Sequence, residues 1–244
     1  MEHFNLLQGP ILTSFAETGD PEPLQQEYGK SSEGFRLTQA GYLPLLQLAR
    51  ELPNVRSDIV PGFPPREWAR LIMRGGKDAL FIDQRVESLQ VLQGFDRWDD
   101  LNVSPEHDAY IRASMTGQRP TLGEQPTKQG GLNAAQAFKD SVMAWKADQL
   151  LLAMKERKRS KSKEVNSSGS EKDEVLVVIC GSGHCEYGFG FPERMRACKR
   201  EEMSLIVAKP DDGGYWTTSE DVDDQSSGNR SLADALVVFE AVDV

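Results

Sequence analysis

The spacing of hydrophobic residues in the first third of the chain predicts helices. Apolar positions recur three and four residues apart, which makes one apolar face on a helix. A polar stretch beginning at Glu22 is either an irregular connection or a weak helix to Gln26. The predicted helices cover residues 10–18, 42–52 and 64–75, each ended by glycine or proline.

Two further helices are predicted in the middle of the chain. Ser104 precedes Pro105 and a helical stretch, so its hydroxyl is expected to cap that helix. Its third residue, His107, is expected to be a partly solvated helical histidine. Asn133 is expected to cap a longer helix that runs to about Lys158, with a broad apolar side. The segment from Leu89 to Phe95 fits a strand or a helix.

Short apolar runs bounded by turn residues predict strands. The clearest is Val175 to Cys180, which is apolar throughout and therefore expected to be buried on both faces. The other predicted strands cover residues 55–60, 203–208 and 236–242. Strands that alternate with helices predict an α/β fold with a mainly parallel central sheet flanked by helices.

Three polar stretches are predicted to be loops. Gly117 to Gly131 reads as a surface loop, and Glu220 to Gly228 as a flexible one. Residues 158–173 are rich in charge and serine and cannot bury enough apolar surface to offset the entropy of ordering, so we expect a disordered insertion. The basic run Lys155 to Lys163 leaves a nuclear-localisation or phosphate-binding role open.

Composition narrows the class of protein. The 244 residues carry a formal charge of −10, which argues against general binding of nucleic acids. Three cysteines without paired CxxC spacing argue against a disulfide framework and a structural zinc site. No apolar run reaches the length of a membrane span, and no secretory signal is evident. We therefore expect a soluble, cytoplasmic chain of one domain, residues 1–244.

Candidate chemistry gathers where the Val175–Cys180 run ends. Gly181-Ser182-Gly183 brings His184 to the expected strand end, where ligands collect in open α/β sheets. Such a histidine suits a metal, a haem or a general base, or simply closes the strand end. Tyr187 is a potential ligand to ferric haem, and Arg194 could pair with a propionate. The G-x-S-x-G frame of a serine esterase is absent.

The stretch GSGHCEYGFGFPERM (181–195) resembles the G-x-G-H-x-x-Y-G-x-G-x-P-x-R block of the ChaN-like haem-binding family in the Tiki superfamily. AQAFKDSVMA (135–144) resembles the family's A-Q-x-x-x-D-x-x-M-A helix. YLPLLQLAR (42–50) and GFPPRE (62–67) resemble an earlier helix and its Pro-Arg turn. The blocks occur in the family's order.

The resemblance implies a non-enzymatic protein that binds haem or an iron complex, in iron or haem uptake or handling. Its implied iron ligands are Tyr187 and His184, without a decision between them. The cofactor-binding residues it implies are His184, Tyr187, Arg194, Gly181, Gly183, Gly188 and Gly190. Implied partners are haem or an iron complex, with a homodimer left open.

One family element has no counterpart in this sequence. Family members begin with a strand that ends in a G-E-x-H block, whereas this chain begins MEHFNLL. The expected sheet therefore lacks its first strand. Two alternatives follow from the same resemblance, a metal-dependent hydrolase and a remnant that binds neither haem nor metal. A preceding targeting segment would make a plastid location an alternative to the cytoplasm.

Overall fold

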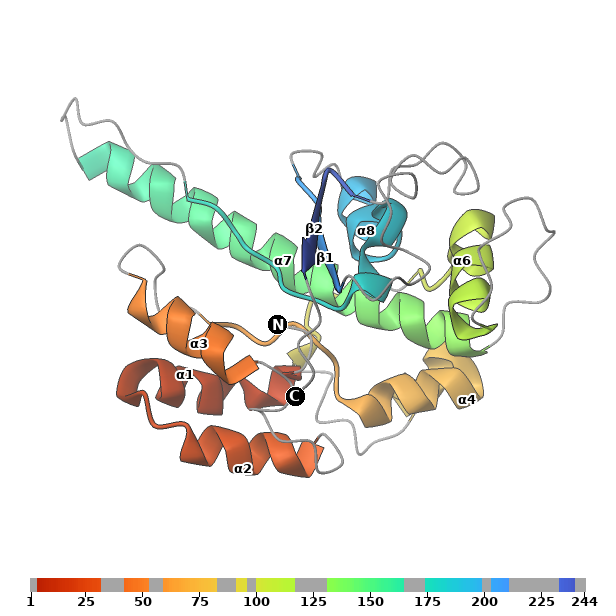
Figure 1. The fold of residues 1–244 in the computed structure, drawn as a ribbon, viewed down its shortest axis with the longest axis horizontal. Helices are drawn as coiled ribbons and strands as arrows, with labels where there is room; N and C mark the ends of the chain where they lie inside the picture. The colour runs from red at the N-terminus through yellow and green to blue at the C-terminus, as the bar shows by residue number, and fades with distance from the viewer. Residues whose placement is uncertain are drawn as a thin grey trace. The chain divides into compact units, whose positions relative to one another are not determined.

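The computed structural model describes residues 4–31, 42–52, 59–82, 91–95, 100–116, 131–164, 174–198, 203–210 and 233–239. The chain forms two compact units, Met1–Pro65 and Arg66–Val244. Figure 1 shows their elements. The candidate site lies entirely within the second unit.

The first unit is built from helices around one apolar cluster. Gly19 ends α1 in a left-handed conformation, and its N–H donates to the Phe15 carbonyl at 2.8 Å. A parallel bridge joins Asn5 to Phe63. Its elements are η1 (Leu6–Gln8), α1 (Gly9–Thr18), α2 (Glu22–Ser31) and α3 (Tyr42–Glu51). Its core comprises Phe4, Leu12, Phe15, Leu24, Tyr28, Leu43 and Leu46.

The second unit is organised around the long helix α7 (Gly131–Glu164), on which α4 (Arg66–Ile82) and α8 (Phe191–Ala197) both pack. Phe95 stands edge-on against Phe138 and Trp145 of α7, at centroid distances of 5.8 and 5.9 Å. The remaining elements are α6 (Pro105–Thr116), η3 (Ser182–His184), η4 (Glu186–Gly188), β1 (Ile206–Pro210) and β2 (Ala235–Phe239).

The helices predicted from apolar spacing are confirmed, with changes at their ends. The stretch at Glu22 is a helix to Ser31, and α4 continues past a non-helical residue, Gly76, to Ile82. The long helix begins at Gly131, so Asn133 is not its cap. The Nδ2 of Asn133 instead donates to Asp108 Oδ1. At its other end α7 extends to Glu164, and residues 165–173 of the expected insertion lie outside the described residues.

The predicted α/β fold with a central parallel sheet is wrong for the described part of the chain, which is mostly helical. Its only sheet there is a parallel pair, β1 with β2, in which Ile206 lies opposite Ala235 and Pro210 opposite Phe239. β1 and β2 overlap in sequence with the predicted strands 203–208 and 236–242. Residues 55–58 of the predicted strand 55–60 lie outside the described residues, as do residues 117–130 and 211–232, which hold two predicted loops.

The prediction of a doubly buried strand at Val175–Cys180 is also wrong. The segment belongs to no strand, and the side chains of Val175 and Val177 are 81% and 74% exposed. Leu176 and Val178, which alternate with them along the chain, are partly buried. The run therefore has one covered side and one open side, which its uninterrupted hydrophobicity did not indicate.

Candidate functional site

The glycine-rich stretch after Cys180 folds as two short 3₁₀ turns followed by helix α8. The His184 N–H donates to the Gly181 carbonyl at 3.0 Å, and the Gly188 N–H donates to the Cys185 carbonyl at 3.1 Å. The backbone enters the left-handed region at Tyr187, with φ 56°. Tight turning of this kind buries every residue from His184 to Pro192.

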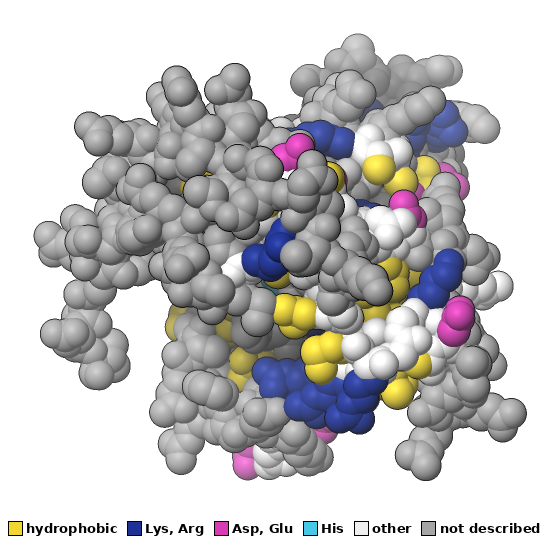
Figure 2. All heavy atoms as spheres, turned by 90° about the vertical axis from the view of Figure 1, so that its right-hand side faces the viewer, with side chains coloured by type: hydrophobic (Ala, Val, Ile, Leu, Met, Phe, Trp, Pro, Cys, Tyr) yellow, Lys and Arg dark blue, Asp and Glu magenta, His cyan; other side chains and the backbone are white. Residues whose placement is uncertain are grey.

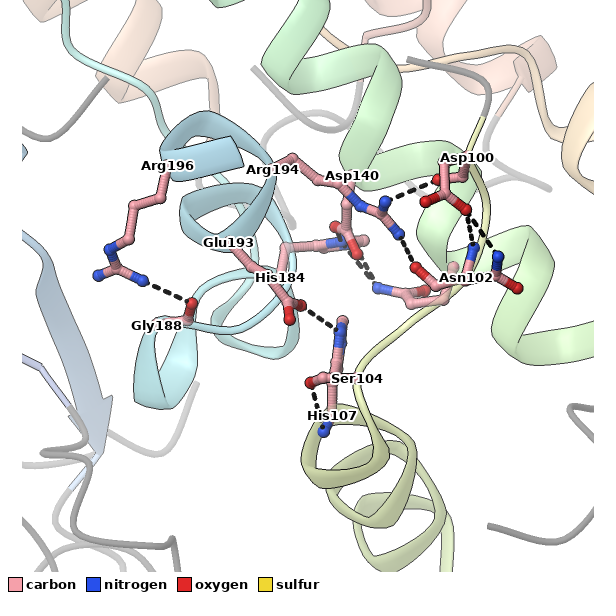
Figure 3. Close-up of polar contacts among 11 residues, drawn as sticks. Asp100, Asn102, Ser104, His107, Asp140, His184, Gly188, Glu193, Arg194 and Arg196 are labelled. Atoms are coloured by element: carbon pink, nitrogen blue, oxygen red, sulfur yellow. Dashed lines mark hydrogen bonds and ion pairs between the residues drawn. The ribbon is translucent and has the colours of Figure 1, made fainter. Parts of the chain in front are cut away.

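His184 is held by two side chains of α7. Its Nδ1 lies 2.5 Å from Oδ1 of Asp140 (Figure 3), and the amide Nε2 of Gln136 lies 2.8 Å from the same Nδ1. Asp140 is fully buried at 0% exposure, and His184 is 6% exposed. Gln136 and Asp140 stand four residues apart, so one face of α7 presents both to the ring.

Gly190 lets the turn close over this pair. Its φ is +61°, and a Cβ built there would lie 2.6 Å from the His184 carbonyl oxygen and 3.0 Å from Asp140 Oδ2. A larger residue would therefore push the turn away from α7. By contrast, a Cβ at Gly183 would meet nothing within 4 Å. Gly183 is therefore at the surface of the turn, whereas His184 is buried.

A second histidine–carboxylate pair lies beside the turn. His107 Nδ1 of α6 is 3.1 Å from Glu193 Oε2 of α8 (Figure 3), and the His107 ring stacks on Phe189 with a centroid distance of 5.2 Å. Ser104 Oγ accepts from the His107 backbone N–H at 3.2 Å, which confirms the predicted cap. The expectation that His107 is partly solvated is wrong, because the residue is 1% exposed.

The pKa of Glu193 lies below its ordinary value of 4.5. Burial acts to raise the pKa of this carboxyl, but the hydrogen bond and charge of His107, with smaller effects of Ser104 and Arg194, outweigh burial. The Glu193 carboxylate is therefore stabilised in its charged form. The pair joins α6 to α8 most strongly when Glu193 is ionised.

Aromatic side chains form the other wall of the turn. Tyr110 of α6, Tyr187 and Phe189 make a buried cluster, with the Tyr110 and Tyr187 rings 5.7 Å apart in an edge-on arrangement. The Tyr110 hydroxyl donates to Glu186 Oε2. Tyr187 is 4% exposed.

The two arginines of α8 have different surroundings. Arg194 donates from Nη1 to the Asp100 carbonyl at 2.6 Å and from Nη2 to the Asn102 carbonyl at 2.5 Å. Arg196 is exposed and donates from Nη1 to the Gly188 carbonyl at 3.0 Å (Figure 3). Of these two side chains, Arg196 is the one that already points toward the turn.

The structure thus places the expected residues of the turn together, but it adds four that we had not predicted as site residues. Asp140 and Gln136 hold His184, and His107 with Glu193 borders the turn. A signal for the first two existed, because both lie in the AQAFKDSVMA block. No signal in the sequence pairs His107 with a residue 86 positions away.

Two kinds of site are absent from the described residues. No group of three or more histidine, cysteine, aspartate or glutamate side chains is arranged there to hold a metal ion. Within the same ranges, none of the helices combines the length and the apolarity that crossing a membrane requires. The expectation of metal binding therefore has no support from a ligand cluster in this part of the chain.

Together these features define a helical protein with a buried, carboxylate-bound histidine on a glycine-rich turn. The chain belongs to the haem-binding uptake family of the Tiki superfamily, ChaN, whose family model matches residues 1–195. The matched range includes both α7 and the turn. Neither a curated protein nor a solved structure gives a significant match to the chain.

Proposed function

We propose that this chain binds haem at the turn, without turnover, and that His184 supplies the nitrogen nearest to iron. Haem is the ligand that the family's description names. The single observation that carries the choice of His184 is the 2.5 Å contact of its Nδ1 with buried Asp140. With Nδ1–H donating to that carboxylate, Nε2 keeps its lone pair for a metal.

Among the residues of the turn, His184 would supply one nitrogen ligand to the haem iron. Histidine ligands to metals ordinarily donate their second ring nitrogen to a carboxylate or carbonyl, and Nδ1 of His184 lies within hydrogen-bonding distance of the Asp140 carboxylate. Gly183, which precedes His184, is exposed, and a Cβ there would meet none of the described residues within 4 Å. Gln136 Nε2 lies 3.4 Å from His184 Nε2, so its amide must swing aside when a ligand binds.

Two arginines of α8 could bind the propionates of the haem. Arg196 is exposed beside the turn, and Arg194 precedes it by two residues. Binding of a propionate by Arg194 requires exchange of its bonds to the carbonyls of Asp100 and Asn102. Figure 2 shows Lys and Arg side chains next to hydrophobic ones on one face of the molecule.

Tyr187 remains in the proposal as the second residue near iron. Its ring is buried against Tyr110 and Phe189, so it forms part of the aromatic wall of the turn. The glycines have a different task. Gly181, Gly183, Gly188 and Gly190 shape the turn, and Gly190 allows the close approach to Asp140.

Titration with haemin, followed by visible spectra, tests the proposal. His184→Ala should weaken binding and alter the spectrum of the ferric complex, and added imidazole should restore the spectrum by entering the space left by the ring. Tyr187→Phe should change affinity only if its hydroxyl reaches iron. Asp148→Asn is the matched control, because it changes a buried polar residue of α7 that lies outside the turn.

The spectra of the two variants distinguish His184 from Tyr187 as the iron ligand. A spectrum changed by His184→Ala alone supports histidine as the donor, and one changed by Tyr187→Phe alone moves the ligand to tyrosine. Haemin spectra and affinity that are the same in the wild-type protein and both variants would remove the turn as the binding site.

A further inference from the structure

We infer that Cys180 and Cys185 are a reversible redox pair, which a small disulfide such as oxidised glutathione joins across the start of the glycine-rich turn. The bond would restrict the opening of that turn, and its formation requires neither haem nor any property of the His184 ring. All three cysteines of the chain lie within residues 174–198, and the structure holds them as thiols. Three observations carry the assignment: the common packing of the two side chains, the position of the Cys185 thiol and the freedom of the backbone between them.

Both cysteine side chains meet at one small apolar cluster. Cys185 is 7% exposed and forms this cluster with Val207 and Ala233. The partly buried Cys180 packs against the same cluster, and it lies on the covered side of the 175–180 segment, as Val178 does. The fold therefore gathers the two side chains at one place, where a bond between their sulfurs can form.

The thiol of Cys185 folds back over the residues that follow Cys180. Its Sγ lies 3.5 Å from the Ser182 carbonyl oxygen and 3.9 Å from the Gly181 carbonyl oxygen. A thiol is a weak hydrogen-bond donor, so these contacts hold the side chain only loosely. Rotation of the Cys185 thiol toward Cys180 therefore sacrifices little.

The backbone between the two cysteines can adjust to a disulfide. Such a bond requires Cα atoms about 4.4–6.8 Å apart and Cβ atoms that point toward each other. Two of the residues between the cysteines are Gly181 and Gly183, whose backbones adopt more conformations than those of other residues. Gly183 is exposed, and a Cβ there would meet nothing within 4 Å, so this part of the turn can move without a collision.

The difference in exposure sets the order of the two steps. The thiolate of Cys180, the more accessible of the pair, attacks one sulfur of oxidised glutathione, releases one glutathione thiolate and keeps the other half as a mixed disulfide. The thiolate of buried Cys185 then attacks the Cys180 sulfur and displaces the second glutathione thiolate. Two protein thiols are thereby oxidised, one oxidised glutathione is reduced to two thiols, and the protons of the protein thiols pass to the released thiolates. Excess dithiothreitol reverses both steps.

Mass spectrometry of the full chain tests the pair without any substitution. After equilibration with mixtures of oxidised and reduced glutathione and alkylation of the remaining thiols, we expect the protein to lose two hydrogens and to keep one alkylated cysteine, Cys198. Proteolysis should then yield a peptide in which Cys180 is bonded to Cys185. Cys198→Ser is the matched control, because Cys198 is also a partly buried thiol, and this variant should form the same bond. A protein that forms no such bond at any ratio of the two glutathiones, or a bond that includes Cys198, would overturn the inference.

Two variants and one exchange measurement test the order of the steps and the effect of the bond. Cys185→Ser should stop after the first step, with glutathione retained on Cys180, whereas Cys180→Ser should take up glutathione at Cys185 roughly tenfold more slowly, because that thiol is buried. Uptake at Cys185 as fast as at Cys180 would overturn the assigned order. In the wild-type protein, amide hydrogen exchange of residues 182–185 should slow several-fold on oxidation and recover with dithiothreitol. Exchange that is the same in both redox states would overturn the restriction of the turn.

Discussion

His107 and Glu193 lie 86 positions apart in the sequence and meet at 3.1 Å, Nδ1 to Oε2, across the boundary between α6 and α8. The contact is flanked by the stack of His107 on Phe189, whose planes differ by 4°. Phe189 belongs to the turn that carries His184. The pair therefore fixes one side of the turn to α6, while Asp140 fixes the other side to α7.

Because of Glu193, we expect the free energy of unfolding of the second unit to depend on pH in the acidic range. Its folded-state pKa is lowered, so its carboxylate contributes stability that is complete above the ordinary pKa of 4.5 and is lost as the pH falls through the lowered value. Glu193→Gln should be less stable than the wild type by roughly 1–3 kcal/mol at neutral pH. Urea unfolding at neutral pH and at about pH 3 measures the difference.

The pH dependence distinguishes the contribution of the His107–Glu193 pair from the destabilisation that acid causes in the protein as a whole. The gap in unfolding free energy between wild type and Glu193→Gln should narrow as the pH falls from 4.5 through the lowered pKa of Glu193, because the carboxyl of the unfolded chain takes up its proton before that of the folded chain does. Asp100→Asn offers a comparison at a residue whose backbone carbonyl binds Arg194 and whose side chain lies in an exposed turn. A gap of equal size at both pH values would mean that the His107 contact does not stabilise the folded state electrostatically.

Gly190 should tolerate no side chain. Gly190→Ala meets the His184 carbonyl at 2.6 Å and forces alanine to a φ of +61°, so we expect a loss of about 1–3 kcal/mol in the free energy of unfolding. Gly183→Ala, where a Cβ meets nothing within 4 Å, should change the free energy by no more than about 0.5 kcal/mol. Equal costs at both positions would argue against the close approach of the turn to α7.

The helices were predictable because their signals are local. A proline in the first turn and a glycine after the last bracket α1, and the Ser104 hydroxyl caps α6 as expected. The sheet was not predictable in the same way. An apolar run such as Val175–Cys180 indicates a buried strand only if other chain segments cover both of its sides, and hydrophobicity alone does not say whether they do.

Only the part of the site that is local in the sequence, the glycine-rich turn, could be predicted. Gly181, His184 and Tyr187 lie close together in the sequence, so the turn could be recognised as one unit. The side chain that determines what His184 can do, Asp140, lies 44 positions earlier. Its position within a resembling block suggested importance, but pairing it with one histidine rather than another requires the packing of α8 against α7.

The two arginines of α8 should contribute differently to haem binding. Arg196→Ala removes an exposed cation beside the turn and should weaken haemin binding, with less effect at high salt because exposed charges are screened. Arg194→Ala should lower stability as well, since it removes two bonds to backbone carbonyls. Titrations at low and high salt, paired with urea unfolding, separate the two effects. Haemin affinity that depends on Arg194 alone, with unchanged stability, would assign the propionate to Arg194.

The exposure of one side of residues 175–180 can be tested by replacing single valines with lysine. Val177→Lys places its ammonium on a side chain that is 74% exposed, so the free energy of unfolding should change by no more than about 0.5 kcal/mol. Val178→Lys, on the partly buried side of the same segment, should cost more, because neighbouring residues of an extended chain point in opposite directions. Urea unfolding of both variants gives the comparison. A cost of several kcal/mol at Val177 would mean that the segment is covered on both sides after all, as a strand within a larger sheet would be.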